Sequence, residues 1–430
     1  MPKKNSHITV TDQFCGAGGS SQGANNAGKK IGGGVEVKLA LNHWALAIET
    51  HNTNFPNTLH DCTDISASDP RRYPSTTILI TSPECTNHSV ANGKKKAKKQ
   101  LDLFTTGKLD PAAERSRATM WDVPRFAEYH GYEAIIVENV VDARKWILFD
   151  TWLKTMHALN YQHRCIYLNS MHCYPTPQSR DRMYIVFWKK GNRAPLLDYT
   201  PTAHCPKCSK EVKAVQTWKK HGVRFGKYRD QYVYCCPVDG MIVEPYYHAV
   251  FNIIDWSDLG VRIGDRKKAL CKNTIKRINH GLTKYEKIYT SGVPPFIIKT
   301  ENTQNEDNVR LFNEVLQTQT TWQTMGLVTP MGVNGFLAGY YNGSHCVKHI
   351  TEEMGSVTTV DSHALVTYQY PILEDCYYRM LKPHEIKLGM AFDPDYIVLG
   401  SGKDQVRQLG NAVTPPAMEW LVGQVIESLK

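Results

Sequence analysis

Short apolar strands separated by amphipathic stretches dominate the first 190 residues, and no other feature of the chain constrains its fold as strongly. The clearest example is AIIVE at residues 134–138, which is apolar until its last residue. Strands of this kind are typical of a parallel sheet covered by helices on both faces, that is, of a doubly wound α/β domain. We therefore expect strands at residues 7–14, 35–41, 77–81, 134–138, 164–168 and 183–188, a helix from about residue 20, and a last helix at residues 415–429.

The strand pattern ends at GNRAPLLDYTPT, residues 191–202, where Gly and Pro mark a domain boundary. The following stretch is rich in Asn, Thr, Gly and Tyr, with short strands expected at 335–341 and 364–370 and no dominant long amphipathic helix. Helical character returns after Tyr378. We expect a large α/β domain at 1–190, an insertion at 191–241, a smaller domain at 242–375 and a C-terminal segment at 376–430 that returns to the first domain.

Charge and cysteine content narrow the class of protein. The 51 Lys and Arg residues against 41 Asp and Glu give a net charge of +10, which favours an anionic partner such as nucleic acid. No apolar run approaches the roughly 20 residues of a membrane helix, so we expect no membrane association. No secretory signal follows the N-terminus, and the 12 scattered cysteines do not form a disulfide framework, so we expect a cytoplasmic protein.

Residues suited to chemistry follow three of the expected strands. A glycine-rich loop, FCGAGG at residues 14–19, follows the first strand, and such loops let the backbone approach a ligand closely. Cys85 follows the strand at 77–81, and Glu138 ends the strand at 134–138. Each has a plainer interpretation: an ordinary turn, a buried structural thiol, or a carboxylate that caps the next helix.

Four cysteines cluster after residue 200 in a pattern that looks like a zinc ribbon. Its first knuckle contains Cys205 and Cys208, and Cys236 with Asp239 would complete a tetrahedral site. Because Asp239 stands where a fourth cysteine would be, Cys235 or His204 could replace it. The alternative is a degenerate ribbon whose thiols pack without metal. The insertion would be structural or would present Lys219, Lys220 and Arg224 to nucleic acid.

The ordered set of motifs is more specific than any one of them. The glycine-rich loop is followed by PEC at 83–85, ENV at 138–140, QSRDR at 178–182 and GNAVTPP at 410–416. In this order, from Asp12 to Pro416, the motifs resemble those of the cytosine-C5 DNA methyltransferases, of bacterial or phage type. The variable stretch falls where that family keeps its target-recognition region, so residues 242–375 would recognise DNA and residues 1–190 would bind S-adenosylmethionine and carry out catalysis.

The resemblance implies a role for each motif. Cys85 would be the nucleophile that adds to cytosine C6, and Glu138 would hydrogen-bond N3 and N4, either protonated or sharing a proton with the base. Arg182 would hold the O2 atom, with Arg180 as its partner in the same motif. The cytosine would be flipped out of duplex DNA. The remaining implied residues would contact S-adenosylmethionine: Phe14, Gly16, Gly18, His43, Trp44, Asp61, Asn411 and Val413.

Three positions depart from the family pattern. His43 stands where the family has an acidic residue for the ribose hydroxyls, and an imidazole offers fewer acceptor sites than a carboxylate. Glu84 and Thr86 flank the nucleophile in place of Pro and Gln, and a carboxylate at 84 would oppose thiolate formation unless it points away or is paired. His88-Ser89 replaces the usual Phe-Ser, and Ser89 still suits a phosphate contact.

Two further segments suit contacts with DNA. Lys94, Lys95 and Lys96 begin a basic run just beyond Cys85, where the family has a mobile loop that closes over DNA; the alternative is a solvated segment. The residues from Tyr340 to His345 form a polar, aromatic stretch that could reach base edges or merely turn a hairpin.

The sequence thus predicts a monomeric DNA cytosine-5 methyltransferase with S-adenosylmethionine as cofactor and a structural zinc ion. Its biological role would be DNA modification, within a restriction-modification system or in anti-restriction. An RNA or tRNA cytosine methyltransferase is the rival enzyme, and the long stretch between Trp188 and Arg379 argues against it. A catalytically silent DNA-binding protein is the rival of another class, and the presence of Cys85, Glu138 and Arg182 argues against that.

Overall fold

The computed structural model describes residues 7–84, 119–286, 293–300, 308–330 and 372–430, together with the backbone of three strands between 335 and 367. The chain divides into two compact units. The first comprises Met1–His248, Gln317–Trp322 and Pro383–Lys430, and the second comprises Ala249–Leu316 and Gln323–Lys382. Each unit is described by itself.

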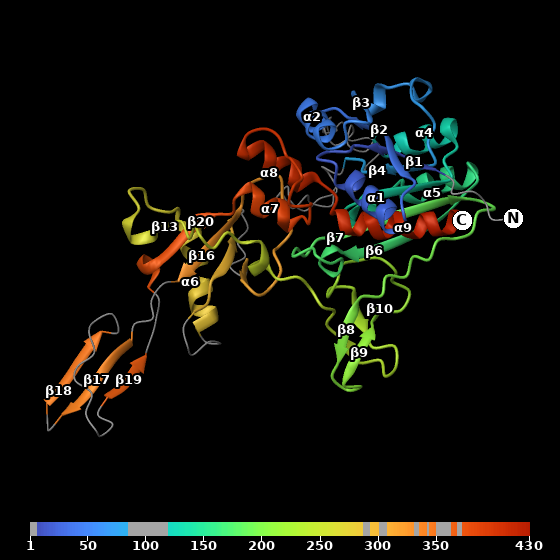
Figure 1. Ribbon diagram of the computed structural model, residues 1–430. Coiled ribbons are helices and arrows are strands. Elements are labelled where there is room, and N and C mark those ends of the chain that lie inside the picture. Colours follow the sequence, from blue (N-terminus) through green and yellow to red (C-terminus); the bar gives the residue numbers. More distant parts are fainter. Residues whose placement is uncertain are drawn as a thin grey trace, which may run out of the picture. The chain divides into compact units, whose positions relative to one another are not determined.

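A seven-stranded sheet forms the centre of the first unit (Figure 1). Its strand order is β3-β2-β1-β4-β5-β7-β6, which confirms the expected doubly wound α/β fold. The strands are β1 (Ile8–Gln13), β2 (Val35–Asn42), β3 (Leu59–Cys62), β4 (Ile78–Thr81), β5 (Ala134–Asn139), β6 (Tyr161–Asn169) and β7 (Asp181–Lys189).

Two details of the sheet differ from the sequence-based expectation. Strand β7 runs antiparallel to both β5 and β6, because residues 170–180 are too few for a helical crossover between β6 and β7. Strand β3 was not expected, because its sequence, LHDC, has no apolar run and its residues are exposed or half-buried at the sheet edge.

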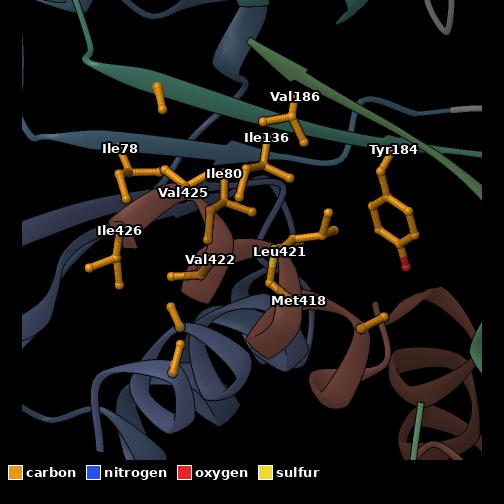
Figure 2. Close-up of a cluster of buried hydrophobic side chains, with 14 of the residues drawn as sticks. Ile78, Ile80, Ile136, Tyr184, Val186, Met418, Leu421, Val422, Val425 and Ile426 are labelled. Carbon is orange, nitrogen blue, oxygen red and sulfur yellow. The ribbon is translucent and has the colours of Figure 1, made fainter. Parts of the chain in front are cut away.

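The C-terminal helix α9 (Pro415–Leu429) covers one face of this sheet and has the predicted bounds. Figure 2 shows Ile78, Ile80 and Ile136 of the central strands facing α9, whose side of the contact contains Leu421, Val422, Val425 and Ile426. Helix α1 (Gly19–Lys30) packs on the same face and adds Ala24 and Ala27 to the buried cluster. Burial of this apolar surface, at roughly 1.5–3 kcal/mol for each large side chain, is what ties the end of the chain to its beginning.

The other helices of the first unit surround the sheet or lie near its carboxyl edge. Trp152 of α5 contacts Phe187 of β7, whose side chain points away from the α9 face because neighbouring Val186 points toward it. The helical character expected after residue 378 is present in two helices besides α9. These two are α7 (Pro383–Gly389) and α8 (Gly402–Asn411). The earlier helices of this unit are α2 (Ala45–Asn54), α4 (Asp122–His130) and α5 (Phe149–Ala158).

Short strands after residue 200 form the insertion of the first unit. The strands are β8 (Thr202–Cys205), β9 (Lys210–Lys213), β10 (Val215–Trp218), β11 (Tyr232–Cys235) and β12 (Ile242–Val243). The ring of His172 is edge-on to Tyr228 and Tyr234, with centroids 4.5 and 4.9 Å away. The Gln216 amide also donates to the Tyr167 carbonyl of β6 (2.9 Å), so the insertion is attached to the edge of the main sheet.

The second unit has a five-stranded antiparallel sheet of order β13-β20-β16-β14-β15. Its helix α6 (Lys272–Glu286) packs Ile278, Leu282 and Tyr285 against Phe296 of β14. The sequence predicted no dominant long amphipathic helix in this stretch, and this 15-residue helix corrects that expectation. Its apolar positions are few among many polar residues, so its helical period is weak in the sequence. The strands are β13 (Val261–Arg262), β14 (Phe296–Lys299), β15 (Val309–Leu311), β16 (Met325–Pro330) and β20 (Cys376–Met380).

A separate three-stranded sheet, of order β18-β17-β19, has β17 (Gly335–Tyr341) at the predicted position. Strand β18 (Ser344–His349) is antiparallel to it, with Tyr341 opposite Ser344. This register fits the hairpin alternative for that stretch. Strand β19 (His363–Thr367) lies close to the strand expected at 364–370. None of the helices in the described ranges is long and apolar enough to cross a membrane.

Candidate active site

The glycine-rich loop connects β1 to α1 at the carboxyl edge of the sheet. Phe14, Gly16 and Gly18 all have positive φ, at 58°, 52° and 88°, so the chain turns sharply where it leaves β1. A Cβ atom on Gly19 would lie 2.0 Å from the carbonyl oxygen of Val413, which explains why this position is glycine. A Cβ atom on Gly16 would meet no atom nearer than 3.9 Å, so the loop is open to a ligand on that side.

The ends of β2 and β3 carry the side chains of Asn42 and Asp61, and the indole of Trp44 follows β2. The side-chain Oδ1 of Asn42 accepts from the backbone N–H of Trp44 (2.9 Å), which fixes Trp44 at the start of α2. The guanidinium of Arg407, from α8, lies 4.5 Å from the centre of the Trp44 ring and packs against one of its faces. Asp61 on β3 accepts a hydrogen bond from the Tyr73 hydroxyl (2.7 Å). Trp44 and Asp61 therefore have defined positions near the loop, while Asn411 is exposed and Val413 is buried.

Glu138 and Arg182 form an ion pair where β5 ends and β7 begins. The Nε atom of Arg182 lies 2.8 Å from Oε1 of Glu138, and their side chains are only 14% and 12% exposed. Because β7 is antiparallel to β5, the beginning of β7 lies beside the end of β5 at the same edge of the sheet. The pair thus places a carboxylate and a guanidinium together, an acceptor and a donor that can bind one edge of a planar heterocycle.

Arg180 has a different environment from Arg182. It is 3% exposed, and its guanidinium donates to the backbone carbonyls of Gln319 (3.1 Å), Gly410 (3.1 Å) and Ala412 (3.0 Å). Its own N–H donates to the side chain of Asn169 (3.0 Å). These contacts join the QSRDR motif to the GNAVTPP motif, so the geometry favours a positioning role for Arg180 over contact with a substrate.

The chain that leads to the expected nucleophile is anchored beside Glu138. The Ser82 N–H donates to the Gln13 carbonyl of β1 (3.3 Å), and the Asn139 side chain donates to the Pro83 carbonyl (3.4 Å). The side-chain Oδ1 of Asn139 accepts from the N–H of Val140 (2.8 Å), which orients the Asn139 amide so that the ENV motif holds the PEC motif by its backbone. Cys85 itself lies outside the described residues, as do Ser89, Lys94, Lys95 and Lys96.

Two of the three departures from the family pattern meet in space. Nδ1 of His43, directly after β2, lies 3.6 Å from Oε1 of Glu84, directly before Cys85 in the chain. Both side chains reach solvent, with exposed fractions of 59% and 38%. The Glu84 carboxylate therefore lies beside an imidazole, and the two form an ion pair when His43 is protonated.

The expected metal ligands converge in the insertion. One ligand atom from each of Cys205, Cys208, Cys236 and Asp239 lies within 4.8 Å of all the others. The Cys208 and Cys236 sulfurs are 3.8 Å apart, too far for a disulfide bond, and the Cys205 sulfur is 3.4 Å from Oδ2 of Asp239. Neither alternative ligand, Cys235 or His204, belongs to this cluster among the described residues.

Some residues of the site were not expected from the sequence. Arg407, Tyr73 and Asn169 are supporting residues that lie outside the recognised motifs. Arg407 could have been suspected only as a cation on an expected helical segment, and nothing in the sequence indicates its contact with Trp44.

Comparison with known proteins identifies the family of the chain. The model of the C-5 cytosine-specific DNA methylases matches residues 8–427, so the chain belongs to this family and is a methyltransferase. A search of curated protein sequences returned no match. The family implies S-adenosylmethionine as cofactor and DNA as substrate.

Solved structures resemble the chain over nearly its whole length. They include the Entamoeba histolytica methyltransferase EhMeth (12% identity, 99% of both chains, TM-score 0.51) and a mutant of Spodoptera frugiperda DNMT2 (15% identity, 97% of this chain and 99% of that one, TM-score 0.51). The S. pombe Dnmt2 methyltransferase is similar at 13% identity, with 98% and 99% covered and a TM-score of 0.50. At these identities the likeness establishes the fold alone.

Proposed function

We propose that this chain methylates C5 of a flipped-out cytosine in double-stranded DNA through a covalent bond between Cys85 and C6 of the base. The observation that carries the proposal is the Glu138–Arg182 pair, which lies beside the anchored chain leading to Cys85. A carboxyl group, a guanidinium and a thiol are the three groups that the reaction needs around one ring.

The reaction needs covalent activation because C5 of cytosine is a poor nucleophile. The Cys85 thiolate forms a bond to C6, and the electron pair released toward N3 makes C5 nucleophilic. Glu138 stabilises the charge at N3, and Arg182 holds the O2 atom. Once C5 carries the methyl group, its proton passes to water, and the electron pair of the broken C5–H bond re-forms the C5=C6 double bond and expels the Cys85 thiolate.

S-adenosylmethionine, when bound, supplies the electrophilic methyl group. The residues present suit such a cofactor: the loop is open at Gly16, and Trp44 has an aromatic face for adenine opposite the one that Arg407 covers. Phe14, Gly18 and Asp61 would line the same pocket, and Val413 would close it through the backbone that approaches Gly19. The exposed Asn411 would contact the cofactor from outside the buried core.

The charge distribution favours a nucleic acid as substrate, and the long stretch between Trp188 and Arg379 favours DNA over tRNA. Lys219, Lys220 and Arg224 of the insertion are exposed, and so are Lys267 and Lys268 of the second unit. Cations of this kind neutralise phosphates and so contribute binding without reading the sequence. We assign recognition of the target sequence to residues 242–375, which include most of the second unit.

We also assign a structural zinc ion to Cys205, Cys208, Cys236 and Asp239. In a tetrahedron with Zn–S bonds of about 2.3 Å, two sulfurs are about 3.8 Å apart, which is the separation of Cys208 and Cys236. The Met241 N–H donates to Oδ1 of Asp239 (2.9 Å), which turns Oδ2 toward the sulfurs. Such support of a ligand by a neighbouring hydrogen bond is usual at metal sites.

The test is methyl transfer from radiolabelled cofactor to mixed-sequence duplex DNA and, separately, to tRNA. We expect 5-methylcytosine in the DNA alone, and bisulfite sequencing of host DNA that expresses the chain would reveal the target sequence. Label in tRNA alone would establish the RNA enzyme, and no transfer to either would leave the silent DNA-binding protein. A modification role, with or without a restriction partner, requires transfer to DNA.

A further inference from the structure

Doubly wound folds that bind a nucleoside commonly place a carboxylate after the second strand, where it accepts hydrogen bonds from the ribose hydroxyls. In this chain the residue that follows β2 is His43. A neutral imidazole has one acceptor nitrogen, whereas a carboxylate can accept from both hydroxyls of a diol at once. The end of β2 therefore lacks the group best suited to a ribose.

A carboxylate reaches this place from another strand. Glu84 follows β4, and strands β2 and β4 lie on either side of β1. Its Oε1 atom is 3.6 Å from Nδ1 of His43, so the carboxylate lies directly beside the position where the acidic group is missing. Both side chains are partly exposed, so a ligand can reach them.

Three other described carboxylates at this edge of the sheet have partners that fit other roles. Asp12 is 1% exposed and accepts from the Ser21 hydroxyl (2.7 Å). Asp61 accepts from Tyr73, and Glu138 is paired with Arg182. Of the acidic residues that follow these strands, Glu84 is the one that lies beside His43.

We propose that Glu84 is the acceptor for the ribose hydroxyls of the cofactor and that His43 positions its carboxylate. The assignment rests on the proposed function, because it requires a bound adenosyl group. The two departures from the family pattern are then one change: the carboxylate has moved from the end of β2 to the loop that carries the nucleophile. Since Glu84 precedes Cys85 directly, occupation of the ribose site constrains the chain beside the thiol.

The test measures the dissociation constant of S-adenosylhomocysteine and of its 2′-deoxy analogue by calorimetry. In the unmodified protein, we expect loss of the 2′-hydroxyl to weaken binding about 10-fold or more, as for a hydrogen bond to a charged group. Glu84→Gln should weaken binding of the complete ligand about 10- to 100-fold and make the two ligands nearly equal. Glu49→Gln, which removes an exposed carboxylate from α2, is the matched control and should change neither constant.

A double variant separates the assignment from a general disturbance of the loop. His43→Glu with Glu84→Gln returns the carboxylate to the end of β2 and should recover most of the lost affinity and the preference for the 2′-hydroxyl. Equal binding by Glu84→Gln and the unmodified protein would overturn the assignment, as would an equal loss for both ligands. If the unmodified protein binds neither ligand, the proposed function fails and the assignment fails with it.

Discussion

The active-site pair and the metal-ligand cluster are both built from polar side chains of the first unit, but different features hold them in place. Glu138 and Arg182 project from two long strands of a seven-stranded sheet, with a buried apolar cluster beneath them. In the metal-ligand cluster, Cys205 ends β8, whereas Cys208, Cys236 and Asp239 lie in the turns beside strands of two to four residues, in sheets of only two or three strands. The comparison indicates that the sheet preorganises the first site, whereas the second relies on its ligands being joined by a metal.

The largest expected effect falls on the rate of methyl transfer. Glu138→Gln should slow the single-turnover rate about 100-fold or more, because the variant cannot supply the proton or the charge at N3. Cofactor affinity should change little, whereas the unfolding free energy should fall, because the largely buried Arg182 loses its counter-charge. Rapid-quench measurement of labelled DNA checks the rate.

Glu133→Gln is the matched control, because Glu133 precedes the opposite end of β5 and pairs with Lys189 at the surface. It should leave the rate unchanged. A Glu138→Gln enzyme that transfers methyl groups at the normal rate would remove Glu138 from the mechanism.

Substitution of a proposed metal ligand should lower the stability of the insertion and leave the rate of the chemical step nearly unchanged. Cys236→Ser should abolish stoichiometric zinc, and at zinc concentrations 1,000-fold above the dissociation constant the stability lost is about 4 kcal/mol. Zinc analysis and hydrogen exchange over residues 202–243 measure the two effects. Cys235→Ser changes the neighbouring buried thiol outside the cluster and should keep the metal; equal zinc content in both variants, or none in the unmodified protein, would contradict the assignment.

Arg180 tests whether the active site depends on its supporting contacts. Arg180→Met removes the donors for three buried carbonyl oxygens and should lower the unfolding free energy by about 2–4 kcal/mol. Arg193→Met, at an exposed arginine, should have almost no effect in the same urea titration. If both variants are equally stable, Arg180 does not join the two motifs, and a direct role with the substrate becomes the better hypothesis.

The last prediction concerns pH and leaves both sites chemically unchanged. Burial raises the pKa of the Asp12 carboxyl to about 7, although the Ser21 hydroxyl opposes the shift. The folded protein thus holds a proton that the unfolded chain has released, so this group's stabilisation is complete below about pH 4 and is lost as the pH rises toward 7. Through this group, the unfolding free energy falls by at most about 1.4 kcal/mol for each unit that the pH rises.

Asp12→Asn cannot titrate and should lack this contribution. Urea unfolding at several pH values between about 4 and 7 should therefore give a flatter profile for the variant than for the unmodified protein. Parallel profiles would contradict the raised pKa. Asp12 is buried near the end of β1, just before the glycine-rich loop, so the difference between the two pH profiles also reports on the burial of this end of the strand.

The sequence was most informative where apolar side chains decide the structure. The buried strands and helix α9 follow from runs of apolar residues, whereas the polar edge strand β3 and the antiparallel direction of β7 do not. The family resemblance implied that Glu138 and Arg182 contact the same cytosine, but their ion pair depends on the antiparallel direction of β7, which places the start of β7 beside the end of β5. The His43–Glu84 pair was not expected, because its residues are separated by some 40 positions and each looked like an isolated departure from the pattern.

The central claim is the transient bond between Cys85 and C6 of cytosine. Incubation of the protein and S-adenosylmethionine with duplex DNA containing 5-fluorocytosine at the target tests it directly, because fluorine at C5 prevents release of the base. We expect a covalent protein–DNA complex that mass spectrometry maps to Cys85 and that Cys85→Ser does not form. Methylated product on ordinary DNA without such a complex, or a complex mapped to another cysteine, would contradict the account.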